Sequence, residues 1–188
     1  MTWQSYLTDI ADLLRAVDPA EVQGLIDAIA AAWREGRYVY IIGNGGSGAN
    51  ASHLCEDLGK GTLHDFERQR RLKVLSLTDN TPYILAWGND EGYDRIFVEQ
   101  LKNLAEPDGL LIAISGSGNS PNVLRAVEWA NAHGLRTCGI TGYDGGQLRR
   151  IAQAGLHVPS HDMGAVEAAH AVVFHHLVTA LHEIFQSE

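Results

Sequence analysis

Two stretches of the chain carry histidine and carboxylate at helical spacing. His53 and Asp57 lie four residues apart and Glu56 lies three residues after His53, so the three side chains share one face if this stretch is helical. A second group recurs near the C-terminus: Glu167, His170 and His175. Imidazole and carboxylate are common ligands of Zn²⁺, so two such helices could enclose one ion. The remaining histidines of interest are interpreted as solvated or internally satisfied: His64, His133, His157 and His182.

A second chemical pattern is the serine-rich segment Ser115–Ser120, Ser-Gly-Ser-Gly-Asn-Ser, between an apolar run and a helical one. Small residues let backbone N–H groups converge, the hydroxyls add donors, and the following helix contributes the positive end of its dipole. An ordinary helix cap would need only one hydroxyl, whereas this segment has three. The pattern predicts a phosphate site that needs no lysine or arginine.

A glycine-rich turn, Gly43–Gly48, also follows an apolar run and opens a helix. Its Gly-x-Gly-x-x-Gly spacing matches a dinucleotide fingerprint, but that fingerprint expects an acidic residue about 20 residues further on. The nearest candidate, Asp79, comes about ten residues too late, so no nucleotide cofactor is predicted. A P-loop is excluded because Gly59–Thr62 lacks the Lys-Ser/Thr step.

These groups must be positioned by alternating strands and helices. Two amphipathic helices come first, at about residues 3–14 and 22–33. Short apolar runs then predict strands: Tyr38–Ile42, Leu72–Leu77, Leu110–Ile114, Thr137–Ile140 and Leu156–Val158. Helices are expected between and after them, at about Gly46–Leu58, Thr81–Trp87, Tyr93–Leu104, Asn119–His133, Gly145–Ala154 and Gly164–Phe185. The pattern predicts an α/β fold with a doubly wound parallel sheet in three layers.

Composition narrows the class of protein. The 188 residues suit a single domain over 1–188, and the net charge of −9 argues against nucleic-acid binding. The chain shows no membrane-spanning run and no signal-peptide pattern, so we expect a cytoplasmic protein without a membrane partner. Cys55 and Cys138 are too few for a disulfide scaffold.

Several motifs, in the same order along the chain, resemble the sugar isomerase (SIS) domain family, and within it the phosphoheptose isomerases. They are the two leading helices, the histidine-rich last helix and the segments Gly43–Ser47, Gly88–Asp90, Ser115–Ser120 and Thr141–Gly146. The resemblance implies a flavodoxin-like SIS fold and an aldose–ketose isomerase that converts sedoheptulose 7-phosphate to D-glycero-D-manno-heptose 7-phosphate through an enediol. It also implies a homotetramer, in which residues 1–36 serve oligomer packing.

Roles in the family transfer onto particular residues here. The family's metal ligands, two histidines, a glutamate and a glutamine, fall on His53, His175, Asp57 and Glu167, so one Zn²⁺ per subunit is expected. Asp57 is the expected base, Glu56 its local alternative, and His175 the acid. The resemblance assigns substrate binding to Asn44, Gly45, Gly46, Ser47, Asp90, Ser115, Gly116, Ser117, Asn119, Ser120 and Glu167.

The chain departs from the family at three positions that are polar there and glycine here: Gly61, Gly116 and Gly164. The phosphorylated sugar is therefore the least determined part of the prediction. Two alternatives stay open: isomerisation of another sugar phosphate, and a non-catalytic SIS protein that binds phosphosugars or proteins, like the relative that associates with the replication initiator. That relative lacks the catalytic carboxylate and the last-helix histidine, which Asp57 and His175 supply here.

Overall fold

Five parallel strands form one sheet in the computed structural model, which describes all of residues 1–188. The strands are β1 (Tyr38–Gly43), β2 (Lys73–Ser76), β3 (Leu110–Ser115), β4 (Arg136–Thr141) and β5 (Ala154–His157). Their spatial order is β2-β1-β3-β4-β5, and the register pairs Val39 with both Val74 and Leu110. This is the flavodoxin-like order of a doubly wound sheet, as the sequence predicts.

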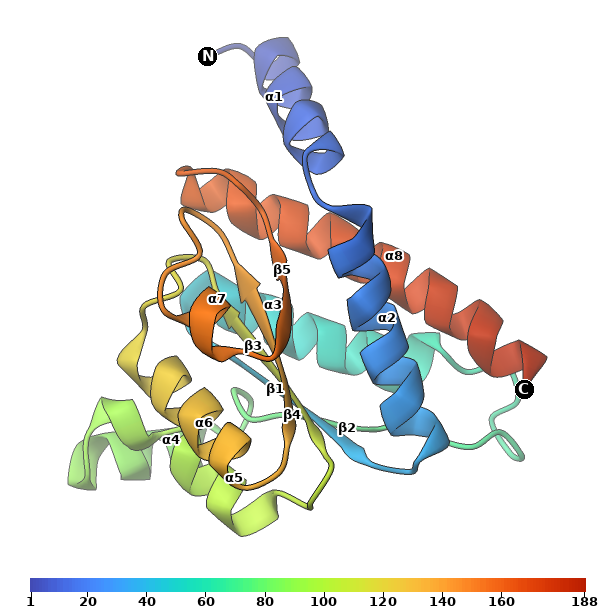
Figure 1. The fold of residues 1–188 in the computed structure, drawn as a ribbon, viewed down its shortest axis with the longest axis vertical. Coiled ribbons are helices and arrows are strands. Elements are labelled where there is room, and N and C mark those ends of the chain that lie inside the picture. Colours follow the sequence, from blue (N-terminus) through green and yellow to red (C-terminus); the bar gives the residue numbers. More distant parts are fainter.

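Helices cover both faces of the sheet (Figure 1). They are α1 (Trp3–Arg15), α2 (Pro19–Arg34), α3 (Gly45–Glu56), α4 (Thr81–Asp90), α5 (Val98–Leu104), α6 (Pro121–Ala132), α7 (Leu148–Ile151) and α8 (Met163–Ser187). A π-helical turn, η1 (Asp57–Gly61), continues α3, and a 3₁₀ turn, η2 (Tyr93–Arg95), precedes α5.

Alternating residues of each buried strand divide the interior into two cores. Val39 and Ile41 of β1 face the core shared with α2, α3 and α8, whereas Tyr40 and Ile42 face the core shared with α5, α6 and α7. Both faces of the strand are apolar because both are covered, which explains the uninterrupted apolar runs. The result is the predicted three-layer arrangement.

The switch point of the sheet lies between β1 and β3, because the chain proceeds from β1 to β2 on one side and from β3 to β4 on the other. The glycine-rich turn follows β1 and the serine-rich turn follows β3. Both turns therefore lie at the edge where doubly wound sheets bind their ligands.

The predicted helix over Gly145–Ala154 forms over fewer residues than expected. Only the single turn α7 forms, because Gly145 and Gly146 adopt φ angles of +86° and +55°, outside the right-handed helical region. The strand after it also begins earlier than predicted, at Ala154, since Gly155 lies directly against the carbonyl of Gly139 on β4.

The predicted helix over Tyr93–Leu104 is divided into η2 and α5. Three consecutive residues at the division, Ile96, Phe97 and Val98, are all buried in one core. On a continuous helix these side chains would span an arc of about 200° at 3.6 residues per turn. The break allows all three to reach the same core.

Two helices at the ends of the chain differ in their environment. No residue of α1 is buried, and its Trp3 is 65% exposed. By contrast, α8 is long and apolar enough to pass a length-and-composition test for a membrane span. Eight of its residues are buried, and Phe174 and Leu177 lie in the core shared with α2 and α3; the core helix of a globular protein passes the same test.

Candidate active site

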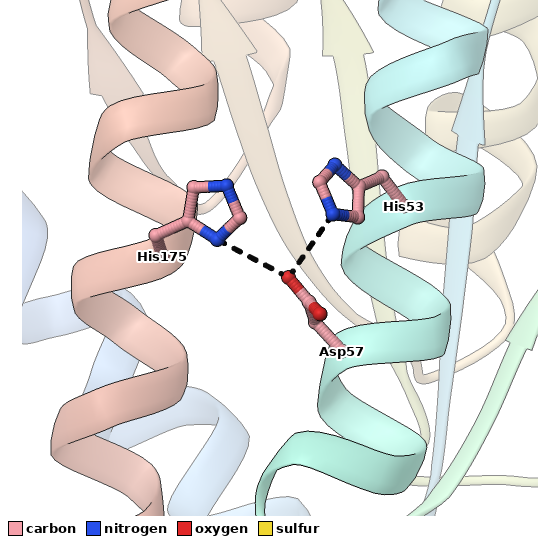
Figure 2. A group of neighbouring side chains, drawn as sticks. All are labelled: His53, Asp57 and His175. Carbon is pink, nitrogen blue, oxygen red and sulfur yellow. Dashed lines mark ion pairs between the residues drawn. The ribbon is translucent and has the colours of Figure 1, made fainter.

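Three of the predicted residues meet between α3 and α8. Asp57 Oδ2 lies 3.5 Å from His53 Nε2 and 3.3 Å from His175 Nδ1. The two imidazole rings are 5.0 Å apart and nearly perpendicular, with the carboxylate between them (Figure 2). We call these three side chains the His-Asp-His cluster. It is the one group of potential ligand atoms in which all members lie within 4.8 Å of one another.

Local sequence explains why the cluster faces solvent. Ala51, Leu54 and Leu58 are buried beneath α3 and η1, which turns the opposite face outward. His53 and His175 have side chains that are 53% and 59% exposed, whereas that of Asp57 is 23% exposed. The π-helical turn begins at Asp57 itself, and such turns are frequent at functional sites. The cluster can therefore receive a ligand from solvent.

The other predicted acidic and basic groups lie elsewhere. Glu56 points to solvent, and its Oε1 lies 3.9 Å from Lys60 Nζ. Glu167 does not join the cluster, because its carboxylate rests on the backbone of Gly46. His170 is fully buried, with Nε2 donating to the carbonyl of Thr141 at 3.2 Å. Burial lowers the pKa of His170 to about 4, so this imidazole is neutral.

The serine-rich turn has the geometry of a phosphate cradle. Ser120 stands at the N-cap of α6 but makes no capping bond, and its Oγ instead lies 3.3 Å from Ser115 Oγ. The backbone N–H groups of Ser117 and Ser120 have no acceptor within the chain. Hydroxyls and free N–H groups thus converge at the positive end of a helix, where an anion is stabilised.

The segment Gly142–Leu148, which follows β4, is hydrogen-bonded to the serine-rich turn. Gly142 N donates to Gly116 O at 2.9 Å, and Leu148 N donates to Gly118 O at 2.9 Å. Gly118 has a φ of +65° and lies so close to Gly145 that a side chain there would collide with its carbonyl. The shape of the cradle therefore depends on glycine at position 118, where this close approach leaves no room for a side chain.

The glycine-rich turn is tied to the cradle by an amide pair that sequence reasoning missed. Asn44 and Asn122 exchange two side-chain hydrogen bonds, both 2.9 Å. The hydroxyl of Tyr93 adds a third at 3.1 Å to Asn44 Oδ1. Asn122 is 1% exposed, although it comes only two residues after Ser120. The only feature of the sequence that points to this pair is a polar residue, Asn122, at the second position of α6.

Two further side chains define the surroundings. Met163, the first residue of α8, places its sulfur where a side chain of Gly116 would lie, so the polar residue that the family has there could not fit without displacing it. Asp90 ends α4, is exposed, and accepts a hydrogen bond from Asn89 at 2.7 Å. It contacts neither the cradle nor the His-Asp-His cluster within the chain.

The donor set of the cluster fits a metal such as Zn²⁺. Two imidazole nitrogens and one carboxylate oxygen already converge, and three protein ligands leave an open position for a reacting group. Neutral imidazole and ionised carboxylate are the forms that bind metal. The fourth predicted ligand, Glu167, lies apart from this set.

Comparison with known proteins agrees with this geometry. A SIS domain model matches residues 3–142 of the chain. The phosphoheptose isomerase of Pelobacter propionicus is 38% identical over 145 residues, which cover 77% of this chain and 75% of that protein. The phosphoheptose isomerase of Syntrophotalea carbinolica is 35% identical over 175 residues, or 92% of this chain and 88% of that protein.

The chain belongs to the SIS domain family, and within it to the phosphoheptose isomerases. A solved phosphoheptose isomerase structure from Francisella tularensis superposes with a TM-score of 0.88 at 28% identity, covering 96% of both chains. The resemblance stated from the motifs is therefore confirmed, and so is the fold that it implies. Within this family, the departure at Gly116 is structurally explained by Met163, which fills the vacated space.

Proposed function

We propose that the protein is an aldose–ketose isomerase that converts sedoheptulose 7-phosphate to D-glycero-D-manno-heptose 7-phosphate. The observation that carries this proposal is the His-Asp-His cluster, a carboxylate held between two imidazoles. The helix α8 contributes a residue to the cradle and to the cluster: Met163 lies against Gly116 of the cradle, and His175 belongs to the cluster. Those two residues are separated by about 18 Å of helix axis at 1.5 Å per residue.

The chemistry requires a base beside the carbonyl and an acid for its oxygen. Asp57 takes the proton from C1 of the ketose while His175 gives a proton to the C2 oxygen, which yields a cis-enediol. Asp57 then returns the proton to C2 while His175 takes the proton from the C1 hydroxyl, which leaves the aldehyde. Glu56, the alternative base, is less suited because it points to solvent beside Lys60.

His53, Asp57 and His175 would hold the zinc ion, whereas Glu167, the predicted fourth ligand, lies apart from them against Gly46. A bound zinc ion would polarise the substrate carbonyl and stabilise the negative charge that develops on its oxygen. Asp57 has two carboxylate oxygens, and only Oδ2 faces both imidazoles. The other oxygen is then available for proton transfer.

The remaining substrate contacts follow from the two turns. The phosphate is bound at Ser115, Gly116, Ser117 and Ser120, through hydroxyls and free backbone N–H groups. Asn119, also predicted to bind it, shapes the turn, because its backbone N–H and its amide bond to Ser117 and Gln147. The first turn of α3, at Gly45, Gly46 and Ser47, faces the sugar. The amide of Asn44 is largely committed to Asn122 and Tyr93, so its contribution is to place the turn rather than to read the sugar.

A homotetramer is proposed for the assembly, with a single SIS domain over residues 1–188 and the helical pair of residues 1–36 used for packing. Support comes from α1, which buries none of its residues, and from the equally unburied α4, which ends at Asp90. A neighbouring subunit would bring its Asp90 toward the substrate. The cytoplasm is the proposed location, since both cysteines are unpaired.

The test is turnover of a panel of ketose and aldose phosphates by zinc-loaded protein, followed by light scattering for the mass of the assembly. Sedoheptulose 7-phosphate should react fastest. Faster turnover of a different sugar phosphate would replace the substrate, and no turnover of any member would refute the enzyme. A monomer in solution would refute the assembly.

A further inference from the structure

Two helix N-termini at the switch point could each attract a phosphate. Both α3 and α6 begin directly after small-residue turns on the neighbouring strands β1 and β3. At both, the residue at the N-cap makes no side-chain capping bond, Asn44 for α3 and Ser120 for α6. A helix start without a cap leaves backbone N–H groups free for an anion. The fold alone therefore does not decide which end takes the phosphate.

The two helix starts differ in the side chain that lies over them. At α3, both carboxylate oxygens of Glu167 lie where a side chain of Gly46 would begin, well inside the 3.0 Å that real Cβ atoms keep. At the serine-rich turn, the side chains nearest to Gly116 are those of Met163 and Val166, which are uncharged. One site thus carries a fixed negative charge and the other does not.

The position of Glu167 is held by its surroundings. Asn50 Nδ2 donates to the backbone carbonyl of Glu167 at 3.1 Å, which fixes this turn of α8 against α3. The carboxylate is partly buried, and it sits at the positive end of the α3 dipole. Glycine at position 46 is needed for this placement, since any side chain there would push the carboxylate away.

We propose that Glu167 is a specificity-determining residue that bars a second phosphate from the N-terminus of α3. The carboxylate repels phosphate at that end, so the single phosphate of the substrate enters the Ser115–Ser120 cradle. Sugar monophosphates are accepted and sugar bisphosphates are discriminated against. This inference rests on the proposed function, because it assumes a phosphosugar in this site.

The experiment measures binding by calorimetry, so it does not depend on catalysis. Sedoheptulose 7-phosphate and sedoheptulose 1,7-bisphosphate are titrated into the wild type, Glu167→Gln and Glu56→Gln. Glu56 is the matched control because it is a glutamate on the neighbouring helix that pairs with Lys60 in solvent. Zinc content is measured for each protein.

The wild type and Glu56→Gln should bind the bisphosphate at least about tenfold more weakly than the monophosphate, since juxtaposed like charges are costly. In Glu167→Gln the two affinities should come within about threefold, because the repulsion is removed while the shape is kept. The same pattern should persist in protein stripped of zinc by a chelator. A discrimination that disappears with the zinc would mean that Glu167 acts through the metal, and would overturn the proposal.

Equal binding of both sugars by the wild type, or an unchanged ratio in Glu167→Gln, would also overturn it. These outcomes differ from a failure of the proposed function. Monophosphate binding without isomerisation would refute the enzyme but leave the charge selection standing. Binding of neither sugar would refute both the phosphate cradle and this inference.

Discussion

Replacing Asn122 by alanine should destabilise the protein and weaken phosphosugar binding together. The Asn44–Asn122 pair contributes two hydrogen bonds of 2.9 Å, and Asn122 is 1% exposed. Each such bond adds about 1 kcal/mol net, and a buried polar group that loses its partner costs about 1–3 kcal/mol. We therefore expect Asn44→Ala and Asn122→Ala each to lose about 2–3 kcal/mol of unfolding free energy.

The double variant is the sharper measurement. Once both amides are gone, no buried partner is orphaned, so the double variant should lose about as much as either single one, with a coupling energy of about 2 kcal/mol. Tyr93→Phe is the control, because it removes one 3.1 Å bond to Asn44 from a residue that is 60% exposed. It should cost less than about 1 kcal/mol.

Urea unfolding at one fixed protein concentration gives the free energies, and steady-state kinetics give KM for the sugar phosphate. The KM of both single variants should rise more than kcat falls, because the pair fixes the spacing of the two turns rather than the reacting groups. Additive losses, equal to the sum of the single variants within about 0.5 kcal/mol, would refute the reasoning.

Three further outcomes follow from individual residues. Gly118→Ala should lower Tm more than Gly45→Ala, because both positions have positive φ but only Gly118 also lies against the carbonyl of Gly145; equal shifts in a thermal melt would contradict this. Burial lowers the pKa of His170 from 6.5 to about 4, so the unfolded chain takes up the proton first as pH falls. Stability should then drop by up to about 3 kcal/mol between pH 6.5 and 4, and His170→Gln should flatten that slope in unfolding measured against pH. Zinc at about 100 times its Kd should stabilise the wild type by about 2.7 kcal/mol, and Asp57→Ala should abolish the rise in Tm; a retained rise would place the metal elsewhere.

Sequence alone predicted the central strands well because burial on both faces favours an uninterrupted apolar run. The run Tyr38–Ile42 is apolar at every position, and its short length and the glycine that follows it favour a strand over a buried helix. Helix ends were predicted less well. The start of the short α7 depends on positive φ at Gly145 and Gly146, and both glycines lie close to Gly118 on another turn, a contact that only the folded chain makes.

For the site, the spacing of residues along one helix predicted which side chains share a face. The sequence did not show which way a side chain on the facing helix points. The four-residue interval between His53 and Asp57 predicted one shared face, and family resemblance supplied His175 on the facing helix. Glu167 also lies on α8, but its side chain turns to the vacancy above Gly46 instead of the cluster. Asn122 was missed since its partner, Asn44, is 78 residues away and only the folded sheet brings them together.

The most direct test of the central claim compares the wild type with Asp57→Asn on sedoheptulose 7-phosphate, both loaded with zinc and followed by NMR. The wild type should form the heptose 7-phosphate, and Asp57→Asn, which keeps the shape but loses the base, should be slower by at least about 100-fold. Glu56→Gln should retain wild-type activity, because that carboxylate faces solvent. Loss of activity in Glu56→Gln with full activity in Asp57→Asn would contradict the assignment of the base to the His-Asp-His cluster.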